Sequence, residues 1–382
     1  MRNLSSHALS LIVAFALSGC VTPDRNQSGL TSGISSEIKG EFDDAISTYT
    51  RALSGGSVSG DERAILYVRR AYAYIGKGDF DKAIADADAA IQLNPIAEFT
   101  YNARASANFR KQQYDLAIAD WDVAIRLKPL PNLFHSRGSA HVQNGQLDQA
   151  LDDYNEAIRL RPRFADAYES RGNLLIRRGD YERGLIDFDH AIGIQPDNGY
   201  AYNGRGLAYA RAGQYEKAHH EFVTALIFQP KAALFYANRA HMAYSLGRYD
   251  AAAADMAEAV RLMPAAGIDV VWLHLFRHKM RQNDQEEFAR NVAAISQQPW
   301  PHAIASVYLG TMAPEQLHKM VEQASAEAYP SVMCQATFHV GYARFLRGET
   351  GTARPAMQEA AKICPPLSTE QWMASSELKT QR

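Results

Sequence analysis

The sequence predicts an all-α fold in which helix hairpins repeat along the chain as a solenoid. A proline recurs every 34 residues, with one interval of 33, from Pro95 to Pro264, and a period in this range is typical of stacked helical repeats. Each period also contains an aromatic residue four positions before a small one. These pairs are Tyr67 and Ala71, Tyr101 and Ala105, Phe134 and Gly138, Tyr168 and Gly172, Tyr202 and Gly206, and Tyr236 and Ala240.

Each period reads as two antiparallel helices joined by a short turn. Spacings of three, four and seven place side chains on one face of a helix, and small residues recur seven apart in the second half, as Ala218 and Ala225 do. The turn is marked by sequences such as Gly213-Gln214-Tyr215, and the proline ends the second helix. One hairpin cannot bury its apolar face alone, so stacked hairpins cover one another and form a concave surface.

These periods resemble the tetratricopeptide repeat (TPR) family. The resemblance implies a right-handed superhelix of helix hairpins, a TPR α-solenoid, over residues 34–265, with one degenerate and six clear repeats. After Pro264 the spacing blurs, so residues 266–366 are expected to form a divergent helical region that ends in a clear repeat at 334–365. Residues 367–382 are expected to form a tail with one amphipathic helix.

The chain departs from the TPR pattern at one position, where each clear repeat has an arginine followed by an acid 16 residues later. Because the turn lies midway, both positions are about equally far from the hairpin tip and face each other. We interpret them as bidentate bridges that hold the hairpin in register, and a row of anion-binding arginines is the alternative. The pairs are Arg70 and Asp86, Arg104 and Asp120, Arg137 and Asp153, Arg171 and Asp187, Arg205 and Glu221, and Arg239 and Asp255.

The first residues read as a signal for export. Arg2 is followed by an apolar run from Ala8 to Leu17, which is too short to span a bilayer as a helix and is typical of a secretory signal peptide. The sequence Leu17-Ser18-Gly19-Cys20 resembles the lipobox of bacterial lipoproteins. The resemblance implies that residues 1–19 are removed and that Cys20 is lipidated; an ordinary signal peptide with a chance cysteine is the alternative.

The segment after Cys20 is expected to connect a lipid anchor to the folded part. Residues 20–33 are rich in small and polar side chains, which is typical of a flexible tether. Val21 follows the cysteine where an Asp would imply retention at the inner membrane. The resemblance to lipoproteins therefore implies attachment to the outer membrane, with the chain facing the periplasm.

Cys334 and Cys364 begin and end the last clear hairpin. Antiparallel helices bring these ends together, and export to an oxidising compartment favours a disulfide between them. The bond requires alpha carbons within about 7 Å. Two buried free thiols are the alternative.

The sequence contains no recognisable catalytic constellation. It has no Gly-rich phosphate loop, no zinc-protease histidine pair and no Gly-x-Ser-x-Gly motif. His274 and His278 lie one helical turn apart, a spacing that can hold a metal ion, but no third ligand is in obvious reach. We therefore expect no catalytic residue, metal or cofactor and no enzymatic activity. The net charge of −2 gives no indication of nucleic-acid binding.

The concave surface is the candidate site. In TPR proteins it is lined by first-helix positions that flank the packing residues, and here these positions combine apolar, amide and arginine side chains. Such a groove suits an extended or helical peptide with some acidic character. The predicted groove residues are Asn102, Phe109, Arg110, His135, Glu169, Asn173, Arg177, Asn203, Arg211, His241 and Tyr244.

The arrangement of lipobox, tether, repeat array and divergent C-terminal region resembles the NlpI-type lipoproteins. The segments Trp300-Pro301, Tyr308-Leu309-Gly310, 334–341 and Cys364-Pro365 carry that resemblance in the last third. It implies a membrane-anchored scaffold that binds envelope proteins, peptidoglycan hydrolases or a periplasmic protease, commonly as a homodimer. The alternative is a TPR lipoprotein that assists assembly of a pilus or a secretion system.

Overall fold

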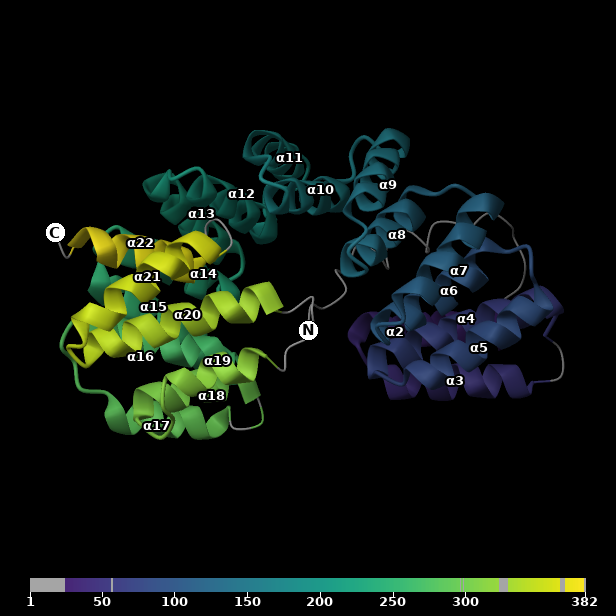
Figure 1. Ribbon diagram of the computed structural model, residues 1–382. Helices are drawn as coiled ribbons and strands as arrows, with labels where there is room; N and C mark the ends of the chain where they lie inside the picture. Colours follow the sequence, from purple (N-terminus) through teal and green to yellow (C-terminus); the bar gives the residue numbers. More distant parts are fainter. Residues whose placement is uncertain are drawn as a thin grey trace. The chain divides into compact units, whose positions relative to one another are not determined.

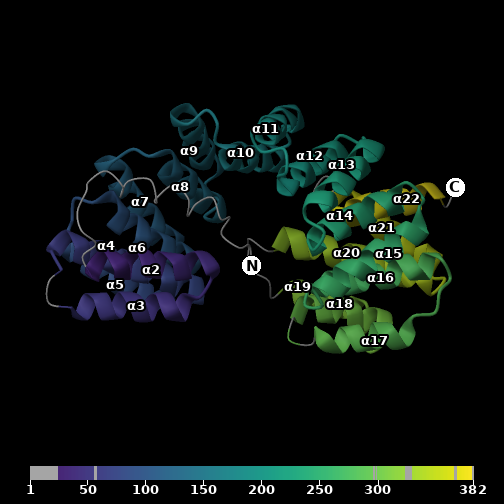
Figure 2. The same ribbon diagram turned by 180° about the vertical axis from the view of Figure 1, so that it is seen from behind.

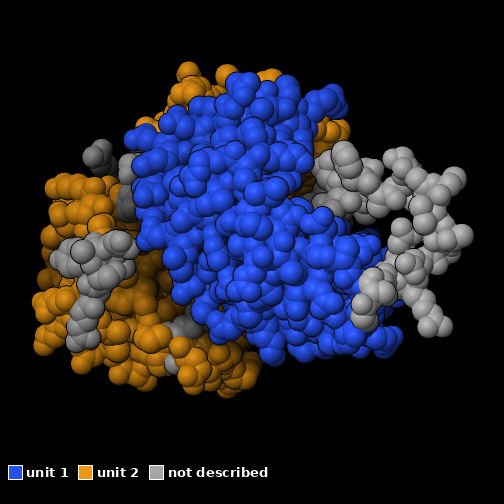
Figure 3. Space-filling view, turned by 90° about the vertical axis from the view of Figure 1, so that its right-hand side faces the viewer, with its two compact units in different colours: residues 1–174 blue, residues 175–382 orange. Residues whose placement is uncertain are grey.

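The structure is a computed structural model that describes residues 25–55, 58–295, 297, 299–322, 329–364 and 368–380. Every regular element in these ranges is an α-helix, and the helices follow one another in tandem pairs (Figure 1). This confirms the predicted all-α TPR solenoid. The chain divides into two compact units, residues 1–174 and 175–382, which are coloured separately in Figure 3 and described separately below.

Unit 1 is a succession of antiparallel hairpins. Each second helix packs against the first helix of the next hairpin, and the first helices also meet directly, as α4 and α6 do. The helices are α2 (Arg25–Lys39), α3 (Phe42–Ser54), α4 (Gly60–Lys77), α5 (Phe80–Leu93), α6 (Glu98–Arg110), α7 (Tyr114–Leu127), α8 (Pro131–Gln143), α9 (Leu147–Leu160) and α10 (Ala165–Arg177), of which α10 runs on into unit 2.

Unit 2 continues the hairpins and then adds further helices. It contains α11 (Tyr181–Ile194), α12 (Gly199–Arg211), α13 (Tyr215–Phe228), α14 (Ala233–Ser245), α15 (Tyr249–Leu262), α16 (Gly267–Lys279), α17 (Gln285–Ala294), α18 (Pro299–Leu309), α19 (Glu315–Val321), α20 (Tyr329–Leu346), α21 (Thr350–Ile363) and α22 (Thr369–Thr380). One core cluster joins α14 to α22 and includes Trp272, Phe338 and Met373. The last third therefore packs as a lobe on the end of the array.

The recurring small residues are explained by close approach between the helices of a hairpin. A Cβ atom added at Gly138 would lie 2.8 Å from Tyr154 Cε1, and one at Gly206 would lie 2.7 Å from Phe222 Cε1. Both distances are shorter than real Cβ contacts. The aromatic ring of the second helix thus occupies the space that a larger first-helix residue would need.

The turn inside each hairpin uses one residue with left-handed backbone. This residue is a glycine in most repeats, for example Gly78 at φ 87° and Gly213 at φ 72°. In the hairpin of α6 and α7 the same position is Gln112, at φ 64°. A side chain with a Cβ is disfavoured in this region, so this turn carries backbone strain that its neighbours avoid.

The helical part of the chain begins earlier than the composition indicated. Residues 20–33 were expected to form a tether, but α2 begins at Arg25. The reason is tertiary packing: Gly33 lies so close to the Tyr49 ring that an added Cβ would be 2.3 Å from its Cε1 atom, and the Tyr49 hydroxyl donates a 2.5 Å hydrogen bond to Glu37. Residues 1–24, with the predicted signal peptide and Cys20, lie outside the described residues.

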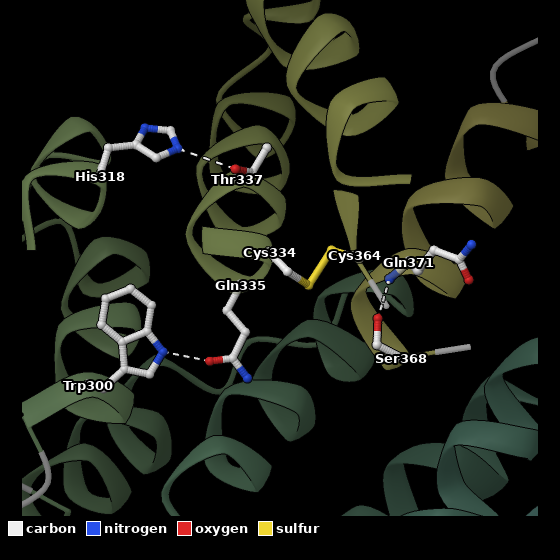
Figure 4. Close-up of a disulfide and its surroundings, with 8 residues drawn as sticks. All are labelled: Trp300, His318, Cys334, Gln335, Thr337, Cys364, Ser368 and Gln371. Atoms are coloured by element: carbon white, nitrogen blue, oxygen red, sulfur yellow. Dashed lines mark hydrogen bonds between the residues drawn. A yellow bond between two sulfur atoms is a disulfide. The ribbon is translucent and has the colours of Figure 1, made fainter. Parts of the chain in front are cut away.

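Cys334 and Cys364 form a disulfide with alpha carbons 4.7 Å apart (Figure 4). The bond joins the N-terminal part of α20 to the end of α21. Next to it, the Trp300 indole donates a 2.5 Å hydrogen bond to Gln335, which links α18 to α20. None of the helices in the described ranges combines the length and apolar character needed to cross a membrane.

Candidate protein-binding surface

The predicted arginine and acid pairs meet across the hairpins in five of the six repeats. Arg104 donates from Nε and Nη2 to the two carboxylate oxygens of Asp120, at 2.9 and 2.7 Å. Arg171 and Asp187 belong to different units, so their pairing stays a prediction. The same bidentate geometry joins Arg70 to Asp86, Arg137 to Asp153, Arg205 to Glu221 and Arg239 to Asp255.

Four of the six arginines also donate to an acidic or amide side chain on the preceding hairpin, an interaction that the 16-residue spacing does not predict. Arg104 Nη1 donates to Asp88 at 2.7 Å. This acceptor lies two residues after the paired acid of the preceding repeat, and that spacing was the signal that could have revealed it. The other examples are Arg137 with Asp122, Arg171 with Asn155 and Arg205 with Asp189. We call this series the arginine ladder.

The arginine ladder holds the repeats together and does not present free cations to a ligand. Hydrogen bonding to Asp120 raises the pKa of Arg104 above its usual range, although burial opposes this. Burial raises the pKa of Asp153, and the bond from Arg137 opposes that effect. Because the guanidinium donors face carboxylates of the same chain, the structure favours the bridging interpretation over a row of anion sites.

Three of the predicted groove residues in unit 1 are held by neighbouring side chains. Asn102 donates to the Tyr72 hydroxyl at 2.8 Å and accepts from the Trp121 indole at 2.8 Å. Phe109 packs against the Trp121 ring, with centroids 5.9 Å apart. His135 Nε2 is hydrogen-bonded to the Ser170 hydroxyl at 3.0 Å, and burial lowers its pKa. These contacts fix the shape of the surface before any partner arrives.

The remaining groove residues of unit 1 are more open. Arg110 and Asn173 are exposed, and Glu169 is half-buried. The Arg110 guanidinium carbon lies 5.9 Å from the centre of the Phe80 ring, so a cation–π contact holds the arginine side chain. We call the surface formed by Asn102, Phe109, Arg110, His135, Glu169 and Asn173 the first-helix face of unit 1.

In unit 2 the predicted groove residues have three different environments. Arg177 is exposed, whereas Asn203 is buried and accepts a 2.8 Å hydrogen bond from Asn238. Arg211 is half-buried and lines a small pocket of about 70 Å³ together with Leu207, Tyr215, His241 and Thr369. Burial lowers the pKa of Arg211.

The prediction that Tyr244 lines the groove is wrong, because the C-terminal lobe covers this residue, whereas His241 is half-buried. Tyr244 is 4% exposed, its ring stacks on Phe276 with centroids 4.8 Å apart, and its hydroxyl donates a 2.7 Å hydrogen bond to Glu377. His241 meets the Trp272 ring edge-on at 5.5 Å, and burial lowers its pKa to about 4. Tyr244 therefore contacts the chain's own helices and does not line an open surface, whereas His241 lines the small pocket beside Arg211.

The described residues show no group of three or more His, Cys, Asp or Glu side chains arranged to hold a metal ion. His274, which the sequence places one turn from His278, is instead hydrogen-bonded through Nδ1 to Asp284 at 2.8 Å. Its ring stacks on Phe288 with centroids 4.1 Å apart. This histidine serves packing between α16 and α17.

Family models of the tetratricopeptide repeat match four segments of the chain. The model described as TPR repeat matches residues 138–179, and those described as tetratricopeptide repeat match 64–96, 165–198 and 203–266. These segments cover the hairpin of α4 and α5 and the helices from α8 to α15, so this part of the chain is similar to tetratricopeptide repeats. No curated protein matches the chain.

Several solved structures share the fold. A tetratricopeptide repeat protein from Parabacteroides merdae is 17% identical, with a TM-score of 0.53, and the match covers 66% of this chain and 98% of that one. The pilF protein of Pseudomonas aeruginosa is 15% identical, with a TM-score of 0.50 and coverage of 58% and 99%. A chain of the APC/C Cut9–Hcn1 hetero-tetramer is 16% identical, with a TM-score of 0.55 and coverage of 75% and 55%. At these levels of sequence identity, the similarities show a shared fold.

Proposed function

We propose that this tetratricopeptide-repeat protein is a non-catalytic scaffold that binds segments of other proteins through the first-helix face of unit 1. Tetratricopeptide repeats form protein-binding surfaces, and function depends on the side chains that each surface presents. In this chain those side chains are an exposed arginine and amide, Arg110 and Asn173, beside polar groups that are already fixed.

One observation carries the proposal: Arg110 and Asn173 are exposed on the first-helix face of unit 1, whereas in unit 2 the C-terminal helices cover Tyr244 at an equivalent position. Within unit 1, substantial packing joins only neighbouring or next-neighbouring helices among α2 to α9. In unit 2, α14 also contacts α22, which is far away in the sequence. A preformed surface with fixed side chains binds with a smaller loss of conformational entropy.

The chemistry of this surface favours a peptide with acidic residues. Arg110 presents a planar cation that can bind a carboxylate in bidentate fashion, and Asn173 presents amide groups that pair with an exposed peptide backbone. The apolar contact would come from Phe109, which is half-buried. An extended or amphipathic helical segment with glutamate or aspartate matches these groups.

We further propose that the scaffold works in the bacterial cell envelope, anchored by a lipid on Cys20 to the outer membrane and facing the periplasm. The sequence of residues 1–20 supports this location. The Cys334–Cys364 disulfide supports it independently, because such bonds persist in oxidising compartments. A Cys20→Ser variant tests the anchor: we expect it to move from the membrane fraction to the soluble fraction, while a Cys334→Ser variant stays with the membrane.

The resemblance to NlpI-type lipoproteins suggests peptidoglycan hydrolases, or a periplasmic protease, as partners. The alternative partners are components of a pilus or a secretion system. A homodimer would present two copies of the binding face. All of these candidate partners would bind the first-helix face of unit 1. Identifying the protein that is bound there therefore distinguishes between them.

The experiment is affinity capture with the tagged full-length chain from an envelope extract. The surface variant carries Arg110→Glu and Asn173→Ala. The matched control carries Arg126→Glu, a charge reversal at an exposed residue of the second helix α7. We expect hydrolases or a protease to be recovered with the wild type and the control but not with the surface variant.

Recovery of pilus or secretion components with the same dependence on Arg110 and Asn173 would favour the alternative role. Equal recovery with all three proteins would place the contact elsewhere and overturn the proposed surface.

A further inference from the structure

The last helix of the chain returns to a repeat far upstream. Figures 1 and 2 show α22 beside α14, and α22 also packs along α21 and contacts α20. Its buried side chains, Glu370, Met373, Ala374 and Glu377, follow the spacing of one helical face. The inward face of this helix therefore carries two glutamates beside Met373 and Ala374.

Glu377 is the charged residue through which α22 binds the helices beneath it. Its side chain is 3% exposed, accepts a 2.7 Å hydrogen bond from the Tyr244 hydroxyl and pairs with Lys279 Nζ at 2.8 and 3.0 Å. Lys279 in turn lies 5.9 Å from the centre of the Tyr249 ring. One carboxylate on α22 is thus bound by groups from α14 and α16.

Tyr244 and His241, which lie near α22, correspond to predicted groove positions in other repeats. Tyr244 is four periods after Phe109, and His241 is two periods after Asn173. At the N-terminal end of α22, Thr369 lines the same pocket as Arg211 and His241. In unit 2, α22 therefore occupies the place in which the first-helix face would hold a partner helix.

A permanent cap would not need a buried carboxylate. Replacing a buried ion pair by apolar side chains of similar volume is often neutral or stabilising, so a leucine in place of Glu377 would cover Tyr244 at least as well. A carboxylate bound by a hydroxyl and an ammonium group instead selects one kind of helix. This is the feature expected of a recognition site whose occupant is exchanged.

We propose that α14, α16 and α20 form a receptor for an amphipathic helix that carries a glutamate, and that α22 is its built-in occupant, displaced by a partner helix of the same chemistry. This site is separate from the first-helix face of unit 1, but its comparison with a partner-binding surface rests on the function proposed for that face. Because α22 is attached to the same chain, its effective concentration is about millimolar. A partner gains access when the Glu377 contact is weakened or when it binds more tightly than α22 does.

The test uses the full-length chain and a labelled synthetic peptide of residues 368–382 as the probe. Glu377→Lys places two cations together and should release α22 from Tyr244 and Lys279. We expect the α22 amides of this variant to exchange hydrogen at least about tenfold faster than in the wild type. We also expect the variant to bind the peptide, as measured by fluorescence anisotropy, while the wild type does not.

Two further variants control the result. Lys279→Glu combined with Glu377→Lys restores an opposite pair, so α22 should dock again and peptide binding should disappear. Glu359→Lys reverses an exposed charge on the neighbouring helix α21 and should behave as the wild type. Glu377→Gln, which keeps the side-chain size, is the second release variant if Glu377→Lys does not fold. We expect it to increase α22 amide exchange and peptide binding by smaller amounts than Glu377→Lys does.

The proposal is overturned if α22 exchanges at the wild-type rate in the release variants, because the carboxylate would then not hold the helix. It is also overturned if α22 is released but no peptide binds, because the surface would then be a simple packing interface. Capture of the envelope partners by the first-helix face of unit 1 is a separate readout, so its success or failure leaves this test unchanged.

Discussion

Arg104 and Asp88 belong to successive hairpins, and Arg104 Nη1 donates a 2.7 Å hydrogen bond to Asp88. The same guanidinium binds Asp120 of its own hairpin through two other donors. One side chain therefore sets the register inside a repeat and joins that repeat to the one before it. Repeat arrays depend on such interfaces between neighbours, because each repeat contacts only the next.

We expect Arg104→Met to lower the free energy of unfolding by about 1 to 3 kcal/mol, since Asp120 would remain buried without its partner. Asp120 is 6% exposed. Asp88→Ala should cost less than about 1 kcal/mol, because that carboxylate is 46% exposed and largely solvated. Thermal unfolding followed by circular dichroism measures both, with Arg126→Met as the control. Equal midpoints for Arg104→Met and the control would contradict a structural ladder.

Gln112 offers an opposite test, in which a substitution should stabilise the protein. Its φ of 64° is left-handed, whereas the equivalent residue in other turns is glycine, as at Gly213. We expect Gln112→Gly to raise stability by about 0.5 to 1 kcal/mol because the strain is removed. The reciprocal Gly213→Gln should lower stability by a similar amount, and changes of the same sign in both variants would argue against backbone strain as the cause.

The disulfide should stabilise the C-terminal lobe. A crosslink that closes a loop of 30 residues restricts the unfolded chain and contributes about 3 to 4 kcal/mol in the chain-entropy model. We therefore expect a reducing agent to lower the unfolding midpoint of the wild type. The double variant Cys334→Ala and Cys364→Ala should unfold at the lower midpoint whether or not the reductant is present. A midpoint in the wild type that does not respond to complete reduction would contradict this role.

Asp269 predicts a dependence of stability on pH. Burial raises its pKa to about 6 from the ordinary 3.8. The folded state therefore binds more protons than the unfolded state between about pH 4 and pH 6, and the contribution of this group to stability falls as pH rises through that range. Asparagine cannot ionise, so Asp269→Asn removes the destabilisation that the buried carboxylate causes above its pKa. The variant should therefore be more stable than the wild type by about 1 to 3 kcal/mol at pH 7.

Denaturant unfolding of the wild type and of Asp269→Asn at a series of pH values measures this pH dependence. The difference between them should be small near about pH 4 and constant above about pH 6.5. A difference of the same size at every pH would show that the carboxyl group does not titrate as proposed.

The repeated part of the chain could be predicted from sequence because the two helices of each repeat pack in the same way. Gly138 and Gly206 are small because a tyrosine or phenylalanine ring fills the space above them, and that constraint recurs with the period. The pairing of Arg104 with Asp120 followed from a fixed spacing around a turn. The link from Arg104 to Asp88 was also present as a spacing, but across the boundary between repeats.

The environment of Tyr244 could not be predicted in this way. Its partner Glu377 lies 133 residues further along the chain, beyond a region where the period is lost. Mapping groove positions from one repeat to the next assumes that every repeat faces an open surface. That assumption fails at Tyr244, which packs against Phe276 of α16 and Glu377 of α22.

The most direct measurement of the central claim is photo-crosslinking in living cells at two positions of the full-length chain. A photoreactive phenylalanine analogue replaces Arg110 on the first-helix face of unit 1 or, as a matched control, Arg126 on the second helix α7. The account predicts a crosslink from position 110 to an envelope protein, identified by mass spectrometry as a peptidoglycan hydrolase or a protease, and none from position 126. Identical products from both positions, or products from position 126 alone, would contradict it.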